Sequence, residues 1–507
     1  MTPAAPDVGE PAAPVVDKLV STSLARAKLG AFDLFMAVLA ALAVMVVISL
    51  VVPLGILTID TSGFPAVMAF TMLVLWLFTR GFGAMGRHVP SAGPFFAYIA
   101  SGLGKPLGVG AALVSLAAYT GFQVSSYGGL GPAVSELLNM AFGIDIVWWV
   151  PALMACLLIA VLGCFNLKKI MMVLTVLAVV EIVLVVALLA AITIMPSFAW
   201  SWQSLSPAHL VSPKAAATFL ACLTSCVGIE HINTYVLETR RPEKTAPRAT
   251  AISIVAMLVL YAGGALVLTS AITAQTAGPD LFLNAASSVL GKAALTGALV
   301  MLSTGLLAGG LAFHNVIARG TFSLAKDFAP DDGLAAVFGR LAANGVPRAA
   351  SMLQSAVGLT VIVMAAYFQW KPKDQLFFWG SVAGGLGILC LFTLTSIAVP
   401  FFFAGNHRGE KAWSRWIAPC LAFAFLAYAT YLGVTTLPSA FGLTSWSGPA
   451  LFTPIGYLAL VVIGVVLGLW LRSYRPATYK GLGLGVTSLA VRTTAPLAAR
   501  DTAEASR

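Results

Sequence analysis

Residues 219–233 read Phe219-Leu-Ala-Cys-Leu-Thr-Ser-Cys-Val-Gly-Ile-Glu-His-Ile-Asn233, an apolar run that meets a glycine and then three strongly polar side chains. A helix facing lipid along its whole length would not place Glu230 and His231 here, because ionisable groups are costly in hydrocarbon. Gly228 lets the backbone leave regular helix geometry, and the freed backbone groups can bind a charged solute where they line a cavity. We therefore expect a membrane span that is interrupted at Gly228.

The composition of the whole chain supports a membrane setting. The 507 residues are 59% hydrophobic and only 9% charged, whereas roughly a quarter of the residues are charged in an average soluble domain. The net charge of +10 could fit a nucleic-acid-binding protein, but the basic residues are scattered in short polar breaks and do not gather on one arm or face. We therefore expect a lipid bilayer around most of the surface and no nucleic-acid partner.

Apolar runs of about 20 residues, the length that crosses a bilayer core, predict an all-α membrane protein with twelve transmembrane helices. The expected spans lie at residues 31–57, 64–86, 107–134, 147–165, 170–195, 215–237, 250–273, 294–318, 350–369, 376–403, 416–437 and 450–471. The Pro/Ala-rich tail of residues 1–30 has no apolar core before Lys18, so we expect no cleaved signal peptide. Residues 473–507 form a second tail.

Lys and Arg are distributed unequally between the two sides of this topology. If both termini are cytoplasmic, only four of the 29 fall on the outer side, namely Lys214, Lys292, Lys371 and Lys373. Cytoplasmic loops of membrane proteins usually carry the excess of basic residues. We therefore expect a multi-pass protein of the cell membrane with both termini in the cytoplasm, and anionic lipid as a secondary partner.

The first span offers a counterpart to the interruption at Gly228. In the stretch Ser49-Leu-Val-Val-Pro53-Leu-Gly55, Pro53 removes an intrahelical hydrogen bond and should kink or break the helix. Interrupted helices at matching places in two halves of a chain point to a transporter's binding site, and spans one and six are five apart. Alternatively, Pro53 and Gly55 mark the end of a helix near the outer surface.

Three further ionisable residues lie inside spans. Glu181, in a Val/Leu-rich helix, is either paired or protonated at neutral pH, so it is a candidate proton carrier or a structural hydrogen-bonding group. His314 follows a face of small residues at positions 305–310 that allows close helix packing. Its ring could titrate near neutral pH or bond a backbone carbonyl. Arg80 is expected to reach the cytoplasmic interface with its long side chain.

Other classes of function lack their signatures in this sequence. All six cysteines lie in apolar segments without a CxxC pair, so we expect neither disulfides nor a metal site, and no cofactor. The absence of HExxH, GxSxG and phosphate-binding motifs argues against an enzyme and against an ATP-driven pump. A receptor would need a soluble signalling domain, for which both tails are too short. A channel is the alternative from another class, although the sequence shows no repeated acidic or carbonyl-rich filter.

Four segments together resemble the amino acid–polyamine–organocation (APC) superfamily of secondary transporters. The segments are Gly86-Arg-His-Val-Pro90-Ser-Ala-Gly93-Pro-Phe-Phe-Ala-Tyr98 with the following Leu103-Gly-Lys-Pro-Leu-Gly108; Gly228-Ile-Glu230 with Leu237-Glu-Thr-Arg-Arg-Pro242-Glu-Lys-Thr-Ala-Pro247-Arg-Ala249; His314-Asn315 with Arg319 and Ala325-Lys-Asp327; and Pro347 before span nine.

The resemblance implies a LeuT-like fold of two inverted five-helix repeats, at residues 31–195 and 215–403, with two extra spans at residues 416–472. It implies that the substrate binds midway across the membrane between the broken first and sixth spans, and that the protein alternates between outward-open and inward-open states. It also implies a set of substrate-binding positions, which are Ser225, Cys226, Val227, Gly228 and Glu230.

Span one departs from the family pattern. Family members hold a substrate carboxylate with backbone groups at a Gly-Ser-Gly motif, and this chain lacks those glycines. The motif aligns either with residues 44–46 or with residues 49–51, depending on which flanking residues are used for counting. Side chains such as Val44 and Met45 would crowd a carboxylate. The substrate therefore either lacks that carboxylate, as an amine does, or binds it at Ser49.

These observations predict a secondary active transporter that moves a small amino acid by alternating access, with an amine or polyamine as the alternative substrate. We expect coupling to protons through Glu181, Glu230 or His314, or simple exchange. Ser303 and Thr304 could contribute hydroxyl groups to a sodium site, but no full set of sodium ligands is visible in the sequence.

Overall fold

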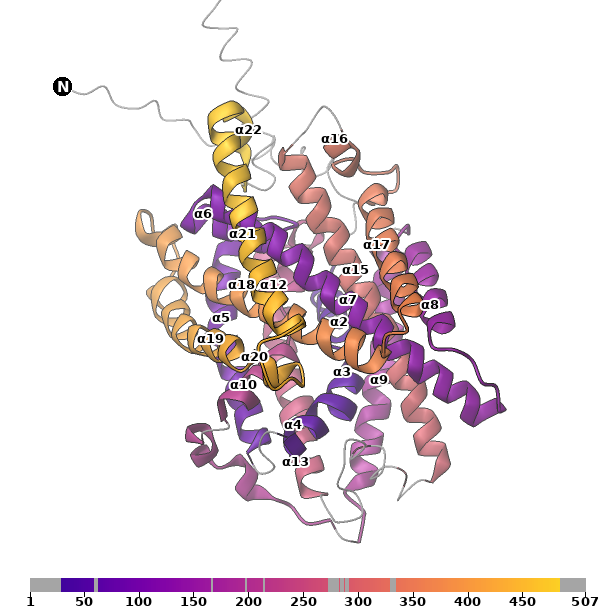
Figure 1. Ribbon diagram of the computed structural model, residues 1–507. Helices are drawn as coiled ribbons and strands as arrows, with labels where there is room; N and C mark the ends of the chain where they lie inside the picture. The colour runs from indigo at the N-terminus through magenta and orange to yellow at the C-terminus, as the bar shows by residue number, and fades with distance from the viewer. Residues whose placement is uncertain are drawn as a thin grey trace, which may run out of the picture.

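The computed structural model describes residues 29–58, 63–165, 167–196, 198–212, 215–271, 282, 287, 291–328 and 334–483. In this part of the chain the regular structure is helical, apart from an isolated parallel bridge between Leu29 and Thr239. The helices pack side by side in one bundle (Figure 1). The prediction of an all-α fold is confirmed.

Ten segments of the described chain are long and apolar enough to cross a membrane. Eight of them are each built around one long helix: α5 (Phe64–His88), α7 (Lys105–Phe142), α9 (Leu167–Ile192), α15 (Lys292–Phe328), α17 (Arg348–Tyr367), α18 (Trp379–Ala404), α19 (Ala418–Thr435) and α21 (Pro449–Tyr474). The π-helical turns η6 (Pro372–Phe378) and η7 (Trp413–Ile417) precede α18 and α19. The chain is therefore a multi-pass membrane protein.

The other two of the ten segments are composed of shorter pieces. One consists of α2 (Ala31–Leu42), α3 (Val44–Val46) and the π-helical turn η1 (Val47–Val51), continued by α4 (Val52–Thr58). The second consists of α12 (Pro242–Met257), η5 (Leu258–Ala262) and α13 (Gly263–Ser270). Short connecting helices are α6 (Pro94–Leu103), η2 (Trp202–Leu205), η3 (Pro207–Val211), η4 (Val236–Glu238), α16 (Leu334–Phe338), α20 (Leu437–Ala440) and α22 (Pro476–Gly481).

Two expected spans are not among these ten segments. Residues 147–165 contain the 14-residue helix α8 (Trp149–Leu162), which is shorter than the roughly 20 residues that a bilayer core requires. Residues 215–237 are split between α10 (Ala215–Thr224) and α11 (His231–Thr234). The count of twelve spans therefore stays a prediction.

Helix α7 runs obliquely through the centre of the bundle, with α15, α18 and α21 packed against it (Figure 1). Small residues permit the close approach of α7 to α18. A Cβ atom added to Gly121 would lie 2.9 Å from the carbonyl oxygen of Gly380, so a larger side chain would push the two helices apart. This is the packing expected in lipid, where backbone proximity and dispersion hold helices together.

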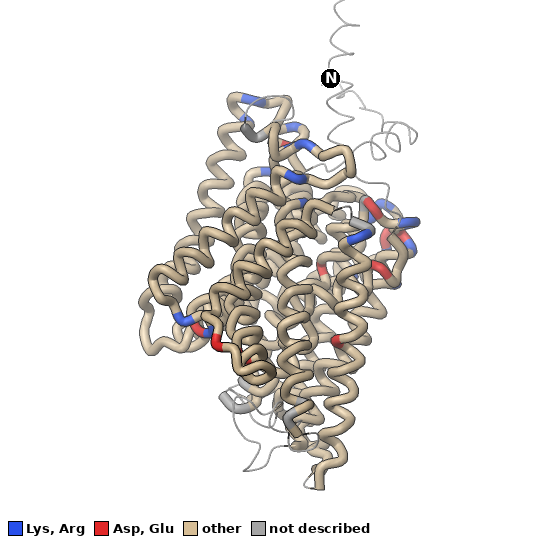
Figure 2. The backbone as a smooth tube through the Cα atoms, turned by 90° about the vertical axis from the view of Figure 1, so that its right-hand side faces the viewer, with Lys and Arg blue, Asp and Glu red and all other residues tan. Residues whose placement is uncertain are grey.

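Charged residues gather toward the two ends of the bundle, and few of them lie in its middle (Figure 2). Most of the described Lys and Arg residues lie at the upper end of the view, where Figure 1 shows α16 and α22, and a smaller group lies at the opposite end (Figure 2). A bundle that crosses a bilayer needs this arrangement, because its charges must reach the headgroup regions.

Candidate functional site

The first membrane span is interrupted at Ala43, between α2 and α3. Ala43 has a φ of 44°, a left-handed conformation that is uncommon for residues other than glycine. Side chains from two distant helical elements bond the backbone groups that the break releases. The Tyr261 hydroxyl of η5 donates to the carbonyl oxygen of Leu42 at 3.1 Å, and the N–H of Met45 donates to Glu181 Oε1 of α9 at 2.5 Å.

This break lies earlier in the chain than the sequence suggests. Pro53 is inside α4, directly after the π-helical turn η1. A proline has no N–H, so its helix loses one backbone bond, and the wider turn of η1 accommodates the loss without a break. The prediction of an interrupted first span is confirmed, but its placement at Pro53 was wrong. The position at Ala43 agrees with alignment of the family motif to residues 44–46.

The sixth expected span is interrupted where the sequence predicts it. Helix α10 ends at Thr224, α11 begins at His231, and residues 225–230 form turns between them. Gly228 has a φ of 131°, which L side chains rarely adopt. A Cβ atom added there would lie 3.0 Å from the Cβ atom of Ala41, near the end of α2. The interruptions of the first and sixth spans therefore contact each other.

Glu230 stabilises the second interruption with both oxygens of its carboxylate. Its Oε2 accepts the N–H of Gly228 at 2.9 Å, and its Oε1 accepts the hydroxyl of Tyr119, on α7, at 2.6 Å. The residue is 1% exposed. A buried carboxylate requires such donors, and short charge-assisted bonds are the strong ones. The carboxylate thus ties the interrupted sixth span to the central helix of the bundle.

His231 is buried beside Glu230 without hydrogen-bond partners. The residue is 0% exposed, and neither ring nitrogen has a partner. Its Nε2 lies 3.8 Å from Glu230 Oε1, and its ring centre lies 5.5 Å from that of Tyr119 and 5.8 Å from that of Phe313. An unsatisfied buried polar group costs about 1–3 kcal/mol of folding free energy. A group that formed a hydrogen bond with this ring would remove part of that cost.

Of the remaining sequence-predicted binding residues, Ser225, Cys226 and Val227 lie at the second interruption, whereas Ser49 lies in the turn η1 that follows the first. Ser225 Oγ donates to the carbonyl oxygen of Ala221 at 2.8 Å, and Cys226 Sγ contacts that of Cys222 at 3.1 Å. Val227 is buried and apolar. Ser49, on η1, donates to the carbonyl oxygen of Met45 at 2.6 Å, so its hydroxyl hydrogen is used inside its own helix. These positions can present backbone groups to a substrate more readily than side chains.

His314 belongs to a second buried polar cluster that joins α7, α15 and α17. Its Nδ1 lies 3.1 Å from Gln123 Nε2, and its Nε2 lies 2.8 Å from Ser351 Oγ. Gln123 also donates to the Tyr127 hydroxyl at 2.8 Å and accepts from Gln354 Nε2 at 2.8 Å. The structure does not bring His314 into contact with either interruption.

The sequence alone did not indicate three residues that bond the interruptions or His314, namely Tyr119, Tyr261 and Gln123. All three are neutral polar side chains on long apolar segments, and a search for ionisable residues does not select them. All three have partners more than one hundred residues away, at separations of 111 for Tyr119, 219 for Tyr261 and 191 for Gln123 with His314. Only the fold brings these pairs together.

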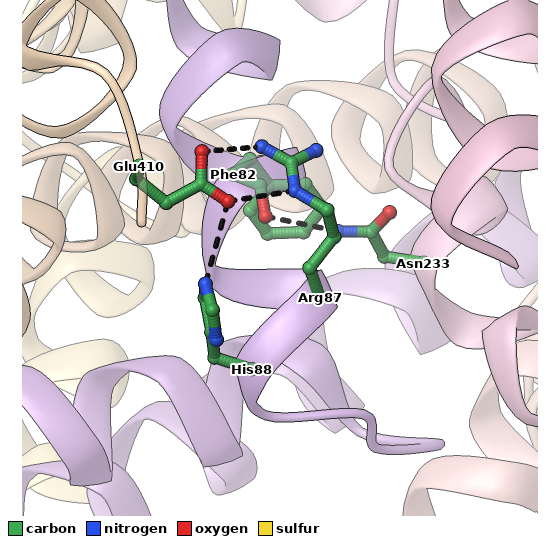
Figure 3. A network of polar contacts seen from close by, with 5 residues as sticks. All are labelled: Phe82, Arg87, His88, Asn233 and Glu410. Atoms are coloured by element: carbon green, nitrogen blue, oxygen red, sulfur yellow. Dashed lines mark hydrogen bonds and ion pairs between the residues drawn. The ribbon is translucent and has the colours of Figure 1, made fainter. Parts of the chain in front are cut away.

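A cavity of about 200 Å³ lies beside the sixth span, between α5 and α12. Arg80, Asn233 and Thr250 are among its polar lining residues. Asn233 Nδ2 donates to the carbonyl oxygen of Phe82 at 3.1 Å (Figure 3). It also donates to the Tyr98 hydroxyl at 3.0 Å. The arrangement anchors the segment after the second interruption to α5.

A charged cluster closes the end of α5 next to this cavity. Arg87 donates two hydrogen bonds of 2.8 Å to Glu410, and His88 Nε2 lies 3.3 Å from the same carboxylate (Figure 3). Partial burial tends to raise the pKa of Glu410, but the hydrogen bonds and charge of Arg87 and the charge of His88 outweigh it and hold that pKa below its ordinary value. The carboxylate is thus kept ionised.

The ends of the first, sixth and eighth spans are fastened together by a group of residues that we call the end latch, in which Leu29, Glu238 and Arg319 are buried. The N–H of Leu29 donates to the carbonyl oxygen of Glu238 at 2.9 Å, and the N–H of Arg240 donates to that of Leu29 at 3.0 Å. The Glu238 carboxylate forms an ion pair of 2.9 Å with Arg319 on α15. The Arg319 guanidinium also lies 5.2 Å from the ring centre of Tyr235. The latch comprises Leu29, Glu238, Arg240 and Arg319.

The described residues contain no group of three His, Cys, Asp or Glu side chains that could hold a metal ion. The six cysteines are free thiols.

A sequence profile of the family described as amino acid permease matches residues 29–465. A search of curated protein sequences finds no match. Among solved structures, a variant of the Eremococcus coleocola manganese transporter with one histidine replaced aligns with a TM-score of 0.59 at 12% identity, over 89% of this chain and 97% of that one. The same transporter in complex with an aromatic bis-isothiourea substituted compound aligns with a TM-score of 0.56 at 12% identity, over 92% and 96%.

At this identity the structural likeness concerns the fold alone. It shows a transporter fold of the LeuT-like kind, so the predicted fold class is confirmed. The repeat boundaries at residues 31–195 and 215–403, and the extra spans at residues 416–472, stay predictions.

Proposed function

Because the chain belongs to the amino acid permease family and has a transporter fold, we propose that it is a secondary active transporter of a small amino acid, with an amine as the alternative substrate. The observation that carries the proposal is the contact between the two interruptions, where Gly228 meets Ala41. Interrupted helices that meet inside a membrane bundle place backbone carbonyl and N–H groups where a solute can bind.

The same interruptions supply the movement that alternating access requires. A helix that is broken at a left-handed residue does not behave as one rigid rod, so its two halves can turn relative to each other. In this chain α2 and α10 precede the breaks, while α4 and α11 follow them. Rocking of one set of half helices against the rest of the bundle would expose the region between Ala43 and Gly228 to one side of the membrane at a time.

Two carboxylates link this movement to protons in our proposal. Glu181 and Glu230 each accept an N–H at one interruption, and an ionised carboxylate accepts such a bond more strongly than a protonated one. Proton uptake would therefore loosen one interruption and couple a proton to the turning of a half helix. Exchange of one substrate for another is the alternative. His314 is a third candidate for proton coupling, through its bonds to Gln123 and Ser351.

The proposed location is the cell membrane, with both termini in the cytoplasm. The concentration of Lys and Arg at the end of the bundle where α22 lies supports it (Figures 1 and 2), because cytoplasmic ends carry the basic excess. Manganese is the cargo named for the structural neighbours, and at 12% identity their cargo does not transfer to this chain.

The experiment is uptake of labelled amino acids and amines into proteoliposomes with an imposed proton gradient, with protein-free liposomes as the control. We expect accumulation that collapses when an ionophore removes the gradient, and Glu230→Gln should abolish its pH dependence. Uptake that ignored the proton gradient and required sodium would contradict the coupling. Single-channel currents in planar bilayers would contradict the transporter proposal and indicate a channel.

A further inference from the structure

The cavity of about 200 Å³ between α5 and α12 has no part in the transport site proposed above. It also borders the turn η7, through Ser414. A water molecule occupies about 30 Å³ in the liquid, so the cavity has room for a larger group. Its lining on α12 runs from Pro242, the first residue of the helix, to Ile254, which is about 18 Å along the helix axis. The cavity therefore extends from the end of α12 into the apolar part of that helix.

Two tryptophans indicate the level of the membrane surface at this cavity. Trp76, one of its lining residues, has its ring centre 6.0 Å from that of Trp413, the first residue of η7. Tryptophan is enriched where a bilayer meets water. The Arg80 guanidinium lies 4.7 Å from the centre of the Trp76 ring, and Leu73, two turns before Arg80 on the same face of α5, is 50% exposed. Arg80 thus lies at headgroup level on a face of α5 that is open to lipid.

The charged side chains that line the cavity are Arg80, Arg87 and Glu243. Arg87 is held by two bonds of 2.8 Å to Glu410 (Figure 3). Neither Arg80 nor Glu243 forms an ion pair with another residue of the described chain. A guanidinium matches the geometry of a phosphate group, and a carboxylate accepts hydrogen bonds from an ammonium group. The cavity therefore suits a zwitterion that carries both groups.

Gly83 keeps space open next to Arg80. It lines the cavity one turn further along α5, and a Cβ atom added to it would meet nothing within 4 Å. At Gly86, by contrast, an added Cβ atom would lie 2.9 Å from Asn233 Nδ2. Alanine favours a helix more than glycine does, so neither packing nor helix propensity explains a glycine at position 83. Its effect is to leave room for a ligand beside the guanidinium.

We propose that this cavity binds a membrane phospholipid with an ethanolamine headgroup, whose phosphate contacts Arg80 and whose ammonium group contacts Glu243. The acyl chains lie along α12, which exposes the apolar side chains of Ile252, Val255 and Val259 at 48%, 60% and 63%. The bound lipid bridges α5, α12 and η7. The inference goes beyond the proposed function, because it assigns a lipid site and names no transported substrate.

The test is the melting temperature of the delipidated protein in detergent, titrated with phosphatidylethanolamine, phosphatidylcholine and phosphatidylglycerol of identical acyl chains. A lipid that binds the folded state raises this temperature. We expect phosphatidylethanolamine to reach half of its effect at a concentration at least about tenfold lower than the other two. The choline nitrogen has no hydrogen to donate, and phosphatidylglycerol has no cation. Equal responses to the three lipids would overturn the proposal. So would an equal response to the soluble headgroup glycerophosphoethanolamine, which would indicate a soluble ligand.

Two charge variants test the two contacts separately. Arg80→Gln should weaken the response to phosphatidylethanolamine by at least about tenfold, because it removes the partner of the phosphate. Glu243→Gln should make phosphatidylethanolamine act like phosphatidylcholine. Arg348→Gln is the matched control, because Arg348 is an exposed basic residue at the start of α17 that does not line the cavity. A wild-type response in Arg80→Gln would overturn the site.

Gly83→Leu tests the cavity without changing a charge. Leucine favours a helix, and the added Cβ atom meets open space, so the melting temperature without lipid should equal or exceed that of the wild type. The response to phosphatidylethanolamine should be lost, because the side chain fills the space beside Arg80. A full response in this variant would place the lipid elsewhere and overturn the proposal.

Discussion

His231 is the residue at which a structural and a functional interpretation of the site predict opposite results. Its two buried nitrogens lack partners, and each such group costs about 1–3 kcal/mol. In His231→Phe the ring keeps its place between Tyr119 and Phe313 without that cost. We expect a melting temperature equal to or above that of the wild type, together with a loss of substrate uptake of at least about tenfold. Thermal unfolding in detergent measures the melting temperature, and uptake into proteoliposomes measures the transport activity.

His314→Phe is the matched control for this substitution. Both nitrogens of His314 have partners, at 3.1 and 2.8 Å, so its removal should lower stability by about 1–3 kcal/mol by leaving Gln123 and Ser351 unsatisfied. A destabilised His231→Phe that transported normally would show that His231 only fills space.

At the scale of the element, the left-handed turn at Gly228 is what separates α10 from α11. Gly228→Ala combines an unfavourable φ of 131° with a Cβ atom 3.0 Å from that of Ala41. We expect a stability loss of about 1–3 kcal/mol and impaired uptake, because the two interruptions are pushed apart. Gly263→Ala is the control, since an added Cβ meets nothing within 4 Å there and alanine favours a helix. Equal melting temperatures for the two variants would contradict the role of Gly228.

The two interruptions differ in how far the sequence predicts them. A glycine followed by Glu230 and His231 is a local signal, and the break at Gly228 follows from it. Ala43 carries no such signal, because alanine is the strongest helix former. The groups that stabilise its left-handed turn are Glu181 and Tyr261, which come from distant helices. Long-range contacts, which propensity cannot register, therefore decide where the first span breaks.

The loop between α18 and η7 is fixed to the end of α5 by Glu410. The bonds to Arg87 and His88 hold the pKa of Glu410 below its ordinary value, so the stabilising contribution is present above that ordinary pKa and is lost as the pH falls through the lowered one. We expect the wild type to melt at a higher temperature than Glu410→Gln at pH 7, with the difference vanishing in acid. A difference that stayed constant down to about pH 3, below the ordinary value, would contradict the ion pair.

At the scale of the whole molecule, the end latch joins the ends of three spans, and the proposed alternating access predicts that it holds one side of the bundle closed. Leu29 precedes α2, Glu238 follows α11 and Arg319 lies on α15, so the latch joins spans that are far apart in sequence. It lies at one end of the bundle, while the two interruptions lie between the ends. A transporter that exposes its site alternately must release this group once in each cycle, because the half helices cannot turn while their ends are tied.

Arg319→Gln should therefore shift the population toward a state that is open at the latch. Removing one member of a buried ion pair costs about 3–5 kcal/mol, and Arg319 is 5% exposed in its side chain against 1% for Glu238. We expect hydrogen exchange of the Leu29 and Arg240 amides to accelerate by at least about tenfold, while concentrative uptake falls and substrate exchange continues. Lys373→Gln breaks the exposed ion pair with Glu136 at 3.9 Å, which contributes under about 1 kcal/mol of stability. This control should change neither the hydrogen exchange of the two amides nor concentrative uptake. Unaltered exchange of both amides in Arg319→Gln would mean that the latch does not hold this end closed.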